Sequence, residues 1–224
     1  MRGLRWESVI GLAVLLVGCG EVPEVPAASA PTSSTVTPYP TDVSPDLDVV
    51  EAAHRFLQSE PHLRGPEILP ELISYLTYDD YEVRDIASKL AFNVAASPDA
   101  RESGLRRAAQ ADPALRAALL DGLSYDAFPI GDSEYTRAQM AGAVYALYRD
   151  HPDAPSDEIR DRLVAQYWDE LSGHARMALV GALCDLEHTG EAVAEVFADA
   201  AASPRELIAD MGRQCLARLE FLPR

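Results

Sequence analysis

The sequence predicts an all-α fold, and three observations carry that prediction. Apolar residues recur at intervals of three and four along most of the chain, and no run alternates with period two over a useful length. Serine or aspartate repeatedly precedes proline, a typical start of a helix. Ala and Leu are prominent and aromatic residues make up only 7% of the chain, a composition that packs well as helices.

The amino terminus, residues 1–18, has the features of an export signal. Arg2 and Arg5 precede an uncharged apolar run that is too short to cross a hydrocarbon core of about 30 Å as a permanent helix. The run closes with LVGC at residues 16–19, which resembles the lipobox of bacterial lipoproteins. The resemblance implies that the thiol of Cys19 takes a diacylglyceryl group and that the signal is cut before it. The alternative is a signal-anchor with an incidental cysteine.

The same resemblance implies attachment to a membrane through Cys19. Each buried CH₂ contributes ~0.8 kcal/mol, and the modification provides the two or more acyl chains that stable attachment needs. In Gram-negative lipoproteins an Asp after the cysteine tends to retain the protein in the inner membrane. Gly20 therefore implies the periplasmic side of the outer membrane in such a bacterium, and the outer face of the cytoplasmic membrane in a bacterium with one membrane.

Residues 19–45 are expected to form a lipid-anchored, disordered linker. Fourteen of the 26 positions from Gly20 to Pro45 are Pro, Ser or Thr, and they show no apolar periodicity that could bury a core. The six prolines favour an extended, semi-rigid spacer. The folded domain is therefore expected over residues 46–224.

Helix-start signals recur from Ser44 onward. Ser44, Ser97, Asp112 and Ser203 each precede a proline, and Glu206 completes a capping box with Ser203. The expected helices span residues 46–59, 67–77, 80–97, 98–110, 113–124, 133–150, 156–171, 173–187, 190–202 and 204–221. The connections are short, so successive helices are expected to pack antiparallel.

Residues 69–96 resemble a HEAT repeat. A first helix with an early proline is followed by an Asp-rich turn and by a second helix with Arg84 in its first turn. Three later segments resemble the repeat more weakly and contain Arg137, Arg176 and Arg213. The spacings between these successive arginines, 39 and 37 residues, are near the length of a two-helix repeat. The resemblance implies a short right-handed α-solenoid of HEAT-like helical hairpins. The alternative is an irregular helical bundle with one HEAT-like hairpin.

The formal charge of −17 bears on the class of partner. Binding to nucleic acid needs clustered Lys and Arg to neutralise phosphates, and the chain holds 36 acidic residues against 19 basic ones. The same balance argues against docking on an anionic lipid surface through a basic patch. No nucleic-acid partner is expected.

No motif of a known catalytic class is present. The sequence holds no His-Glu dipeptide, which paired di-iron sites on HEAT-like folds use, and no HExxH, GxSxG, Walker loop or GxGxxG. Cys184, His188 and Cys215 form a conceivable metal site, but spacing alone is weak evidence, so neither metal nor cofactor is expected.

Cys184 and Cys215 also raise the question of a disulfide in an oxidising compartment. Cys215 lies in the middle of an apolar stripe, whereas Cys184 lies more than a right angle away from Leu179 and Leu186 around its helix. Two separately buried thiols are therefore favoured over a disulfide.

The densest cluster of aromatic and acidic residues is the expected partner-binding site. It comprises Tyr78, Asp79, Asp80, Tyr81 and Glu82, and large amphipathic rings beside carboxylates suit a surface that binds Arg or Lys of another protein.

A second such cluster spans residues 167–170, and the competing interpretation is that Tyr75 and Trp168 fill the core while the acidic residues cap helices. The function expected is a lipid-anchored envelope protein that binds or scaffolds an envelope partner and is not an enzyme. The alternatives are an enzyme, or an enzyme's accessory subunit, with a site that no motif marks, and a structural lipoprotein without a specific ligand.

Overall fold

The computed structural model describes residues 47–124, 134–151 and 156–221. The chain divides into two units, residues 1–44 and 45–224, and all described residues belong to the second. The export signal, Cys19 and the whole of the linker predicted over residues 19–45 lie outside the described residues, so the predictions made for them stay predictions. Within the described ranges no helix has the length and apolarity needed to cross a membrane.

All regular structure in these ranges is helical, as predicted. The helices of the first half are α2 (Leu47–Gln58), η1 (Pro61–Leu63), η2 (Pro66–Ile68), α3 (Leu69–Leu76), α4 (Tyr81–Ala96), α5 (Pro98–Glu102), α6 (Leu105–Ala111) and α7 (Pro113–Asp121). Those of the second half are α8 (Glu134–Tyr148), α9 (Asp157–Asp169), α10 (Gly173–Asp185), α11 (Glu191–Ala201) and α12 (Glu206–Leu219).

One predicted helix is divided in two. The helix expected over residues 98–110 ends at Glu102 and resumes at Leu105, because Gly104 takes a left-handed conformation with φ of 78°. A continuous α-helix does not accommodate that conformation, which glycine adopts without steric cost. The break separates α5 from α6.

The predicted caps have mixed outcomes. Ser97 accepts a hydrogen bond from the Asp99 amide at 3.2 Å, and Asp112 accepts from two amides of α7, so both caps are confirmed. The capping box at Ser203 is wrong. The Ser203 hydroxyl accepts from the Arg205 amide at 3.3 Å within a bend, and α12 begins only at Glu206, so no side chain caps that helix. Ser44 lies outside the described residues.

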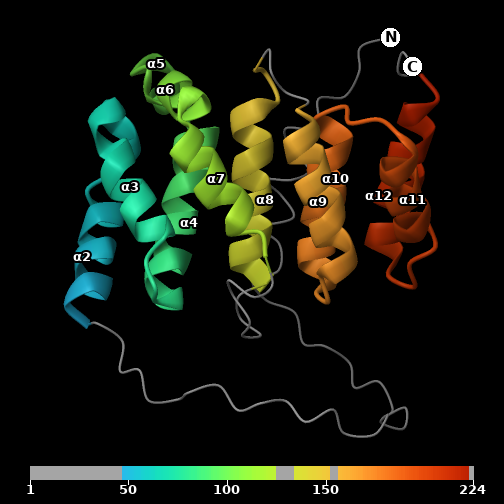
Figure 1. Ribbon diagram of the computed structural model, residues 1–224, viewed down its shortest axis with the longest axis horizontal. Coiled ribbons are helices and arrows are strands. Elements are labelled where there is room, and N and C mark those ends of the chain that lie inside the picture. The colour runs from blue at the N-terminus through green and yellow to red at the C-terminus, as the bar shows by residue number, and fades with distance from the viewer. Residues whose placement is uncertain (1–46, 125–133, 152–155, 222–224) are drawn as a thin grey trace, which may run out of the picture. The chain divides into compact units, whose positions relative to one another are not determined.

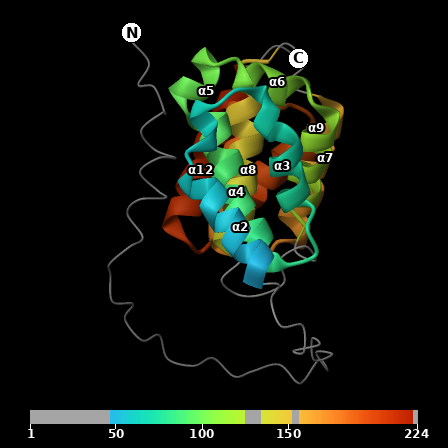
Figure 2. The same ribbon diagram turned by 90° about the vertical axis from the view of Figure 1, so that its left-hand side faces the viewer.

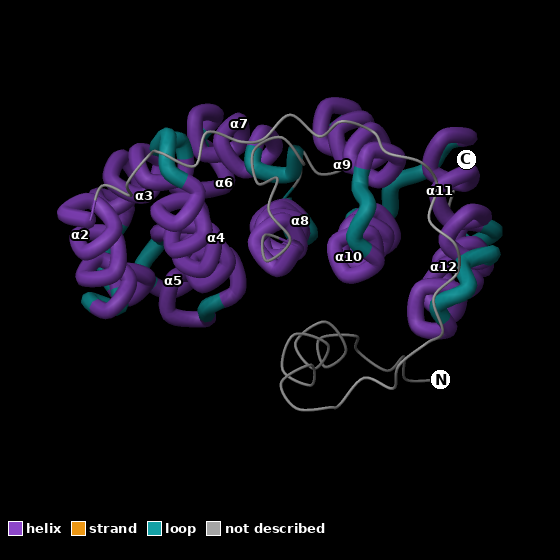
Figure 3. The backbone as a smooth tube through the Cα atoms, turned by 90° about the horizontal axis from the view of Figure 1, so that it is seen from below, coloured by secondary structure: helices purple, strands orange, loops and turns teal. Residues whose placement is uncertain are grey.

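The helices form two layers. Figure 3 shows α4, α8, α10 and α12 along one layer and α3, α7, α9 and α11 along the other, and neighbours within each layer are in contact. Each helix of the second group also packs against the next helix of the first group in the chain, which makes four antiparallel pairs. Helix α2 packs against α4 at the beginning of the row. In the end-on view of Figure 2, α4 and α8 lie behind α2, with α3, α7 and α9 to one side.

The pairing sorts the helix ends into two edges. The ends of α3, α7, α9 and α11 and the starts of α4, α8, α10 and α12 lie together at the lower edge of Figure 1, here called the turn edge. Helices α5 and α6, the residues after α8, and the connection from α10 to α11 lie at the upper edge, here called the opposite edge.

The core follows the row of pairs. Helix α8 lies in the middle and buries eleven of its 15 residues, because α4, α7 and α10 pack around it. The apolar stripe predicted for α4 is confirmed, since Val83, Ile86, Ala87 and Leu90 are all buried. Close packing continues to the end of the row. A Cβ atom on Gly212 of α12 would lie 2.3 Å from the Ala201 amide nitrogen of α11, so only glycine fits there.

The predicted repeat arginines show a common position in three pairs. Arg84, Arg137 and Arg176 are each the fourth residue of their helix. Arg84 donates to the Tyr78 carbonyl at 3.0 Å, and Arg176 donates to the Glu170 carbonyl at 2.7 Å, in each case six residues earlier. The fourth predicted repeat arginine does not share this position, because Arg213 is the eighth residue of α12 and pairs with Asp210.

Candidate functional site

The predicted binding residues lie in the turn between α3 and α4, at the turn edge. Asp79 and Tyr81 are exposed, with 51% of the surface of Tyr81 accessible. Tyr78, Asp80 and Glu82 are half-buried. The five residues therefore lie close together but do not present equal surfaces to a partner.

Two of the five support the fold. Asp80 is the N-cap of α4, and its carboxylate accepts from the Glu82 amide at 2.8 Å and from the Val83 amide at 3.3 Å. Tyr78 packs against the small apolar cluster between α2 and α4 that contains Val83. The surface available for binding is thus carried mainly by Asp79, Tyr81 and Glu82.

Further apolar side chains are exposed along the same edge. Tyr135 is the second residue of α8 and is 45% exposed, while Trp168 near the end of α9 is 46% exposed. Leu171 and Leu207, next to the starts of α10 and α12, are exposed by 77% and 73%. Together with Tyr81, these residues are here called the apolar line. Each of the four helix pairs contributes at least one of them at the turn edge.

Acidic side chains accompany the apolar line. Exposed or half-buried carboxylates stand beside it in each pair: Asp79, Glu82, Glu134, Asp169 and Glu206. Glu134 is bound to the Ser172 hydroxyl, whereas Asp169 and Glu206 are exposed. Arg205 is an exposed cation at this edge and lies over Gly173 of the neighbouring pair. Apolar rings flanked by carboxylates present hydrophobic contact area within a negative potential.

The second predicted cluster is divided between core and surface. Tyr167 is the buried ring, and its hydroxyl donates to the Asp199 carboxylate at 2.7 Å. Burial, followed by this hydrogen bond, raises the pKa of Tyr167 far above its usual range. The Arg176 guanidinium lies over the ring, 5.1 Å from its centre. The interpretation of Trp168 as a core residue is wrong, since its indole contacts Tyr167 edge-on and remains half exposed.

Glu170 and Arg137 form a buried ion pair behind this surface. The two side chains are 0% and 4% exposed, and two hydrogen bonds of 2.5 and 2.9 Å join the guanidinium to both carboxylate oxygens. One of those oxygens also accepts from the Ser172 amide at 2.8 Å. The pair links α8 to the turn before α10, so it fixes the spacing of two neighbouring helix pairs. The sequence carries no local signal of this ion pair, because 33 residues separate Arg137 from Glu170.

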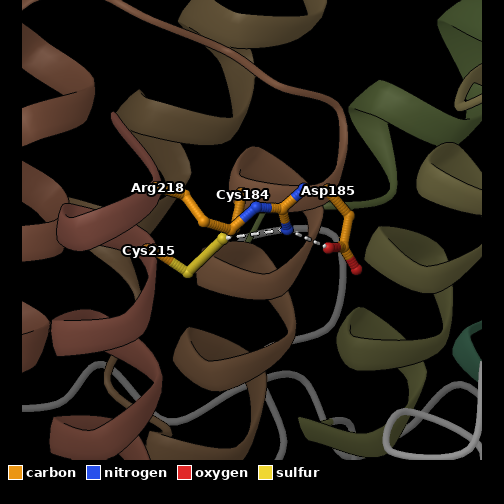
Figure 4. The surroundings of a disulfide bond; sticks show 4 residues. All are labelled: Cys184, Asp185, Cys215 and Arg218. Carbon is orange, nitrogen blue, oxygen red and sulfur yellow. Dashed lines mark hydrogen bonds and ion pairs between the residues drawn. A yellow bond between two sulfur atoms is a disulfide. The ribbon is translucent and has the colours of Figure 1, made fainter. Parts of the chain in front are cut away.

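The two cysteines outside the amino-terminal unit form a disulfide, contrary to the prediction of separate thiols. Cys184 of α10 and Cys215 of α12 are joined, with their Cα atoms 5.5 Å apart, and both are buried (Figure 4). The prediction failed because it assumed one apolar stripe on α10. That helix packs against α8, α9 and α12, so the side of the helix that carries Cys184 is also buried.

Polar groups flank the disulfide. Arg218 approaches the Cys184 sulfur at 3.7 Å and donates to the Asp185 carboxylate at 2.9 Å (Figure 4). Burial raises the pKa of Asp185, and Arg218 opposes that rise. The disulfide also removes both thiols from the metal site considered above. Within the described ranges, no group of three or more His, Cys, Asp or Glu side chains could hold a metal ion.

No family model, curated protein or solved structure matches this chain. The assignment of function therefore depends on the residues and contacts described above.

Proposed function

We propose that this chain is a lipid-anchored protein of the bacterial cell envelope that binds another protein through its turn edge. The export signal and the cysteine at the end of LVGC support the anchor at Cys19. The disulfide between Cys184 and Cys215 supports export, because such bonds persist in oxidising compartments and are rare in the cytosol.

The proposed architecture is a short right-handed solenoid of HEAT-like hairpins. Its support is the two-layer stacking of four helix pairs, each in contact with the next. The arginine at the fourth position of three second helices gives further support, because two of these arginines make the same bond six residues back. A stacked array presents its turns along a continuous edge, where side chains vary without disturbing the core.

The observation that carries the binding proposal is the apolar line along that edge. Five large apolar side chains, at least 45% exposed each, occur at the same end of successive helix pairs. Scattered exposed residues need no explanation, but an aligned series with carboxylates beside it resembles the composition of a protein interface. The partner surface that fits is basic, with Arg or Lys side chains placed over the rings of Tyr81, Tyr135 and Trp168.

The anchor is tested with the variant Cys19→Ser. Metabolic labelling with a fatty acid is expected to label the wild-type chain and not the variant, and the variant is expected to leave the membrane fraction. Equal labelling of both proteins would contradict the anchor.

The binding edge is tested by site-specific photo-crosslinking in membranes. A photoreactive phenylalanine analogue replaces Tyr81 or Tyr135, and matched controls carry it at Leu63 or Phe221, which are exposed but lie away from the turn edge. Positions 81 and 135 are expected to give the same protein adduct, with a basic crosslinked peptide and a yield that falls as salt screens the charges. Adducts that are equal at all four positions, or an acidic crosslinked peptide, would contradict the proposal.

A further inference from the structure

A basic cavity lies at the opposite edge, away from the apolar line. It has a volume of about 430 Å³ and is formed by α5, α6 and the residues that follow α8. The lining residues are Arg101, Arg106, Arg107, Gln110, Asp150 and His151. Gly104 makes this arrangement possible, because its left-handed turn folds α6 back beside α5 and brings Arg101 and Arg106 to the same cavity.

The positive charge of the cavity is not balanced by its own lining. Asp150 supplies the acidic side chain among the lining residues, and a single oxygen of it faces three guanidinium groups. The nitrogens of Arg101, Arg106 and Arg149 lie 3.0, 3.5 and 3.6 Å from that oxygen. Arg107 makes no ion pair with any described residue. The lining thus holds three arginines, Arg101, Arg106 and Arg107, against the single carboxylate of Asp150, in a chain of net charge −17.

The Arg106 side chain is buried, and not all of its hydrogen-bond donors have partners. Its side chain is only 8% exposed, and Nη2 donates to the Ala146 carbonyl at the end of α8. The Nε atom is buried without a hydrogen-bond partner. Burial, and next the charge of Arg101, lowers the pKa of Arg106 while Asp150 opposes that change. A buried donor without a partner is costly to the fold.

A purely structural role accounts for part of this cluster. Arg106 and Gln110 donate to the Ala146 and Leu147 carbonyls, so both residues cap the carboxyl end of α8. Capping does not account for Arg107, which is exposed and unpaired among the described residues. Capping of α8 also does not require that Arg101 pairs with the Asp150 carboxylate.

We propose that this cavity binds a small molecule through a phosphate group. Guanidinium groups match the geometry of phosphate oxygens, and a doubly charged phosphate would offset the charge that Asp150 leaves uncompensated. The preorganised Arg106 supplies the buried contact, and the exposed Arg101 and Arg107 close over the anion from the open side. The cavity has the size of a small-molecule site, with room for more than the phosphate itself. This site is independent of the turn edge and of any protein bound there.

The test measures binding of phosphate-bearing probes to the full chain in a non-ionic detergent at physiological salt. Inorganic phosphate and glycerol 3-phosphate are titrated by calorimetry, and saturable binding with one site per chain is expected. Arg107→Ala is expected to weaken the affinity about tenfold, the effect of one charge-assisted hydrogen bond, with an unchanged melting temperature in the absence of ligand. Arg213→Ala, which removes another exposed arginine far from the cavity, is the matched control and is expected to leave the affinity unchanged.

Asp150→Asn separates binding from capping. Removing the carboxylate that competes for the arginines is expected to raise the affinity for phosphate several-fold, whereas a structural cluster would show only a lower melting temperature.

Thermal melts in the presence of phosphatidylglycerol or phosphatidylcholine vesicles distinguish the source of the phosphate. If only the anionic vesicles raise the melting temperature, and Arg107→Ala abolishes that rise, the phosphate belongs to a lipid headgroup. Absence of any saturable response, an equal response in Arg107→Ala, or weaker binding in Asp150→Asn would overturn the proposal.

Discussion

The two edges of this molecule differ in chemistry although the same helices build both. The turn edge joins the helices of each pair and carries Tyr81, Tyr135, Trp168 and neighbouring carboxylates. The opposite edge joins one pair to the next and carries the arginine cavity around Asp150. The interior between them is mainly apolar. Packing therefore constrains the middle of each helix, and the ends are free to acquire different surfaces.

The edges also differ in how they are stabilised. At the turn edge the pairs are held by the buried bond between Arg137 and Glu170 and by the caps at Asp80 and Ser172. At the opposite edge the ion pair of Arg101 with Asp150 is largely open to solvent. The difference predicts that breaking the buried ion pair at the turn edge costs more stability than breaking the exposed pair of Arg101 with Asp150 at the opposite edge.

The largest effect is expected for Glu170→Gln. It replaces the buried carboxylate that pairs with the Arg137 guanidinium by a neutral amide, and removing one partner of a buried ion pair costs about 3–5 kcal/mol of unfolding free energy. Denaturant unfolding measures the loss. Asp210→Asn, which breaks the exposed pair with Arg213, is the control and is expected to cost about 0–1 kcal/mol. The double variant Arg137→Met/Glu170→Met is expected to be more stable than Glu170→Gln, and equal losses in the two would show that the buried charge is not the cause.

Removal of the disulfide is expected to have the next largest effect. It closes a loop of 31 residues between α10 and α12, and the chain-entropy model gives a stabilisation of about 3–4 kcal/mol for a loop of that length. The melting temperature of the wild-type chain should fall when a reductant is added, and that of Cys184→Ala/Cys215→Ala should not change. A wild-type melting temperature insensitive to the reductant would show two separate thiols.

His188 should make stability depend on pH at the opposite edge. Burial, and next the charge of Arg160, lowers its pKa from 6.5 to about 4. Between those values the unfolded chain binds a proton that the folded chain does not, so stability is complete above the unfolded pKa and is lost as the pH falls towards 4. From about pH 7 to about pH 5 the loss is roughly 2 kcal/mol.

The variant His188→Phe isolates this contribution. A phenyl ring does not titrate and replaces a buried imidazole whose Nε2 atom has no hydrogen-bond partner, so the difference in stability between wild type and variant should change with pH over that window. His54→Gln, at an exposed histidine of α2, should reproduce the wild-type profile. Parallel profiles for wild type and His188→Phe would show that the buried imidazole does not titrate in this range.

The smallest effect separates two neighbouring acidic residues of the predicted site. Asp80→Ala removes the N-cap of α4 and is expected to cost about 1 kcal/mol, whereas Asp79→Ala is expected to leave stability within about 0.5 kcal/mol. Chemical unfolding of the two variants tests the assignment. If they lose equal stability, the division of this turn between folding and binding is wrong.

The helices were predictable because their signals are local. Apolar spacing and the caps at Ser97 and Asp112 lie within a few residues of the elements they define. The errors arose where a local signal competed with another. Gly104 interrupted a helical pattern, and the Ser203-Pro204 pair formed a bend before α12 instead of its cap. The disulfide was missed because burial on every side of α10 depends on three other helices.

The candidate site was predictable only where a single segment contains it. The turn with Asp79 and Tyr81 stands out in the sequence and is exposed as expected. Tyr135 and Leu207 carry no distinguishing sequence signal, since their alignment follows from stacking of the pairs. The arginine cavity has a weak signal in the three arginines of residues 101–107, but 44 residues separate Arg106 from Asp150. Only the fold brings them together.

Hydroxyl-radical footprinting tests the central claim most directly, because it compares the two edges in one experiment and requires no knowledge of the partner. Oxidation of the side chains is measured for the purified chain and for the chain in its native membrane. Binding at the turn edge predicts strong protection of Tyr81, Tyr135 and Trp168 in the membrane and unchanged oxidation of Leu63 and Phe221. Equal oxidation of the apolar line in both preparations, or protection confined to Leu63 and Phe221, would contradict it.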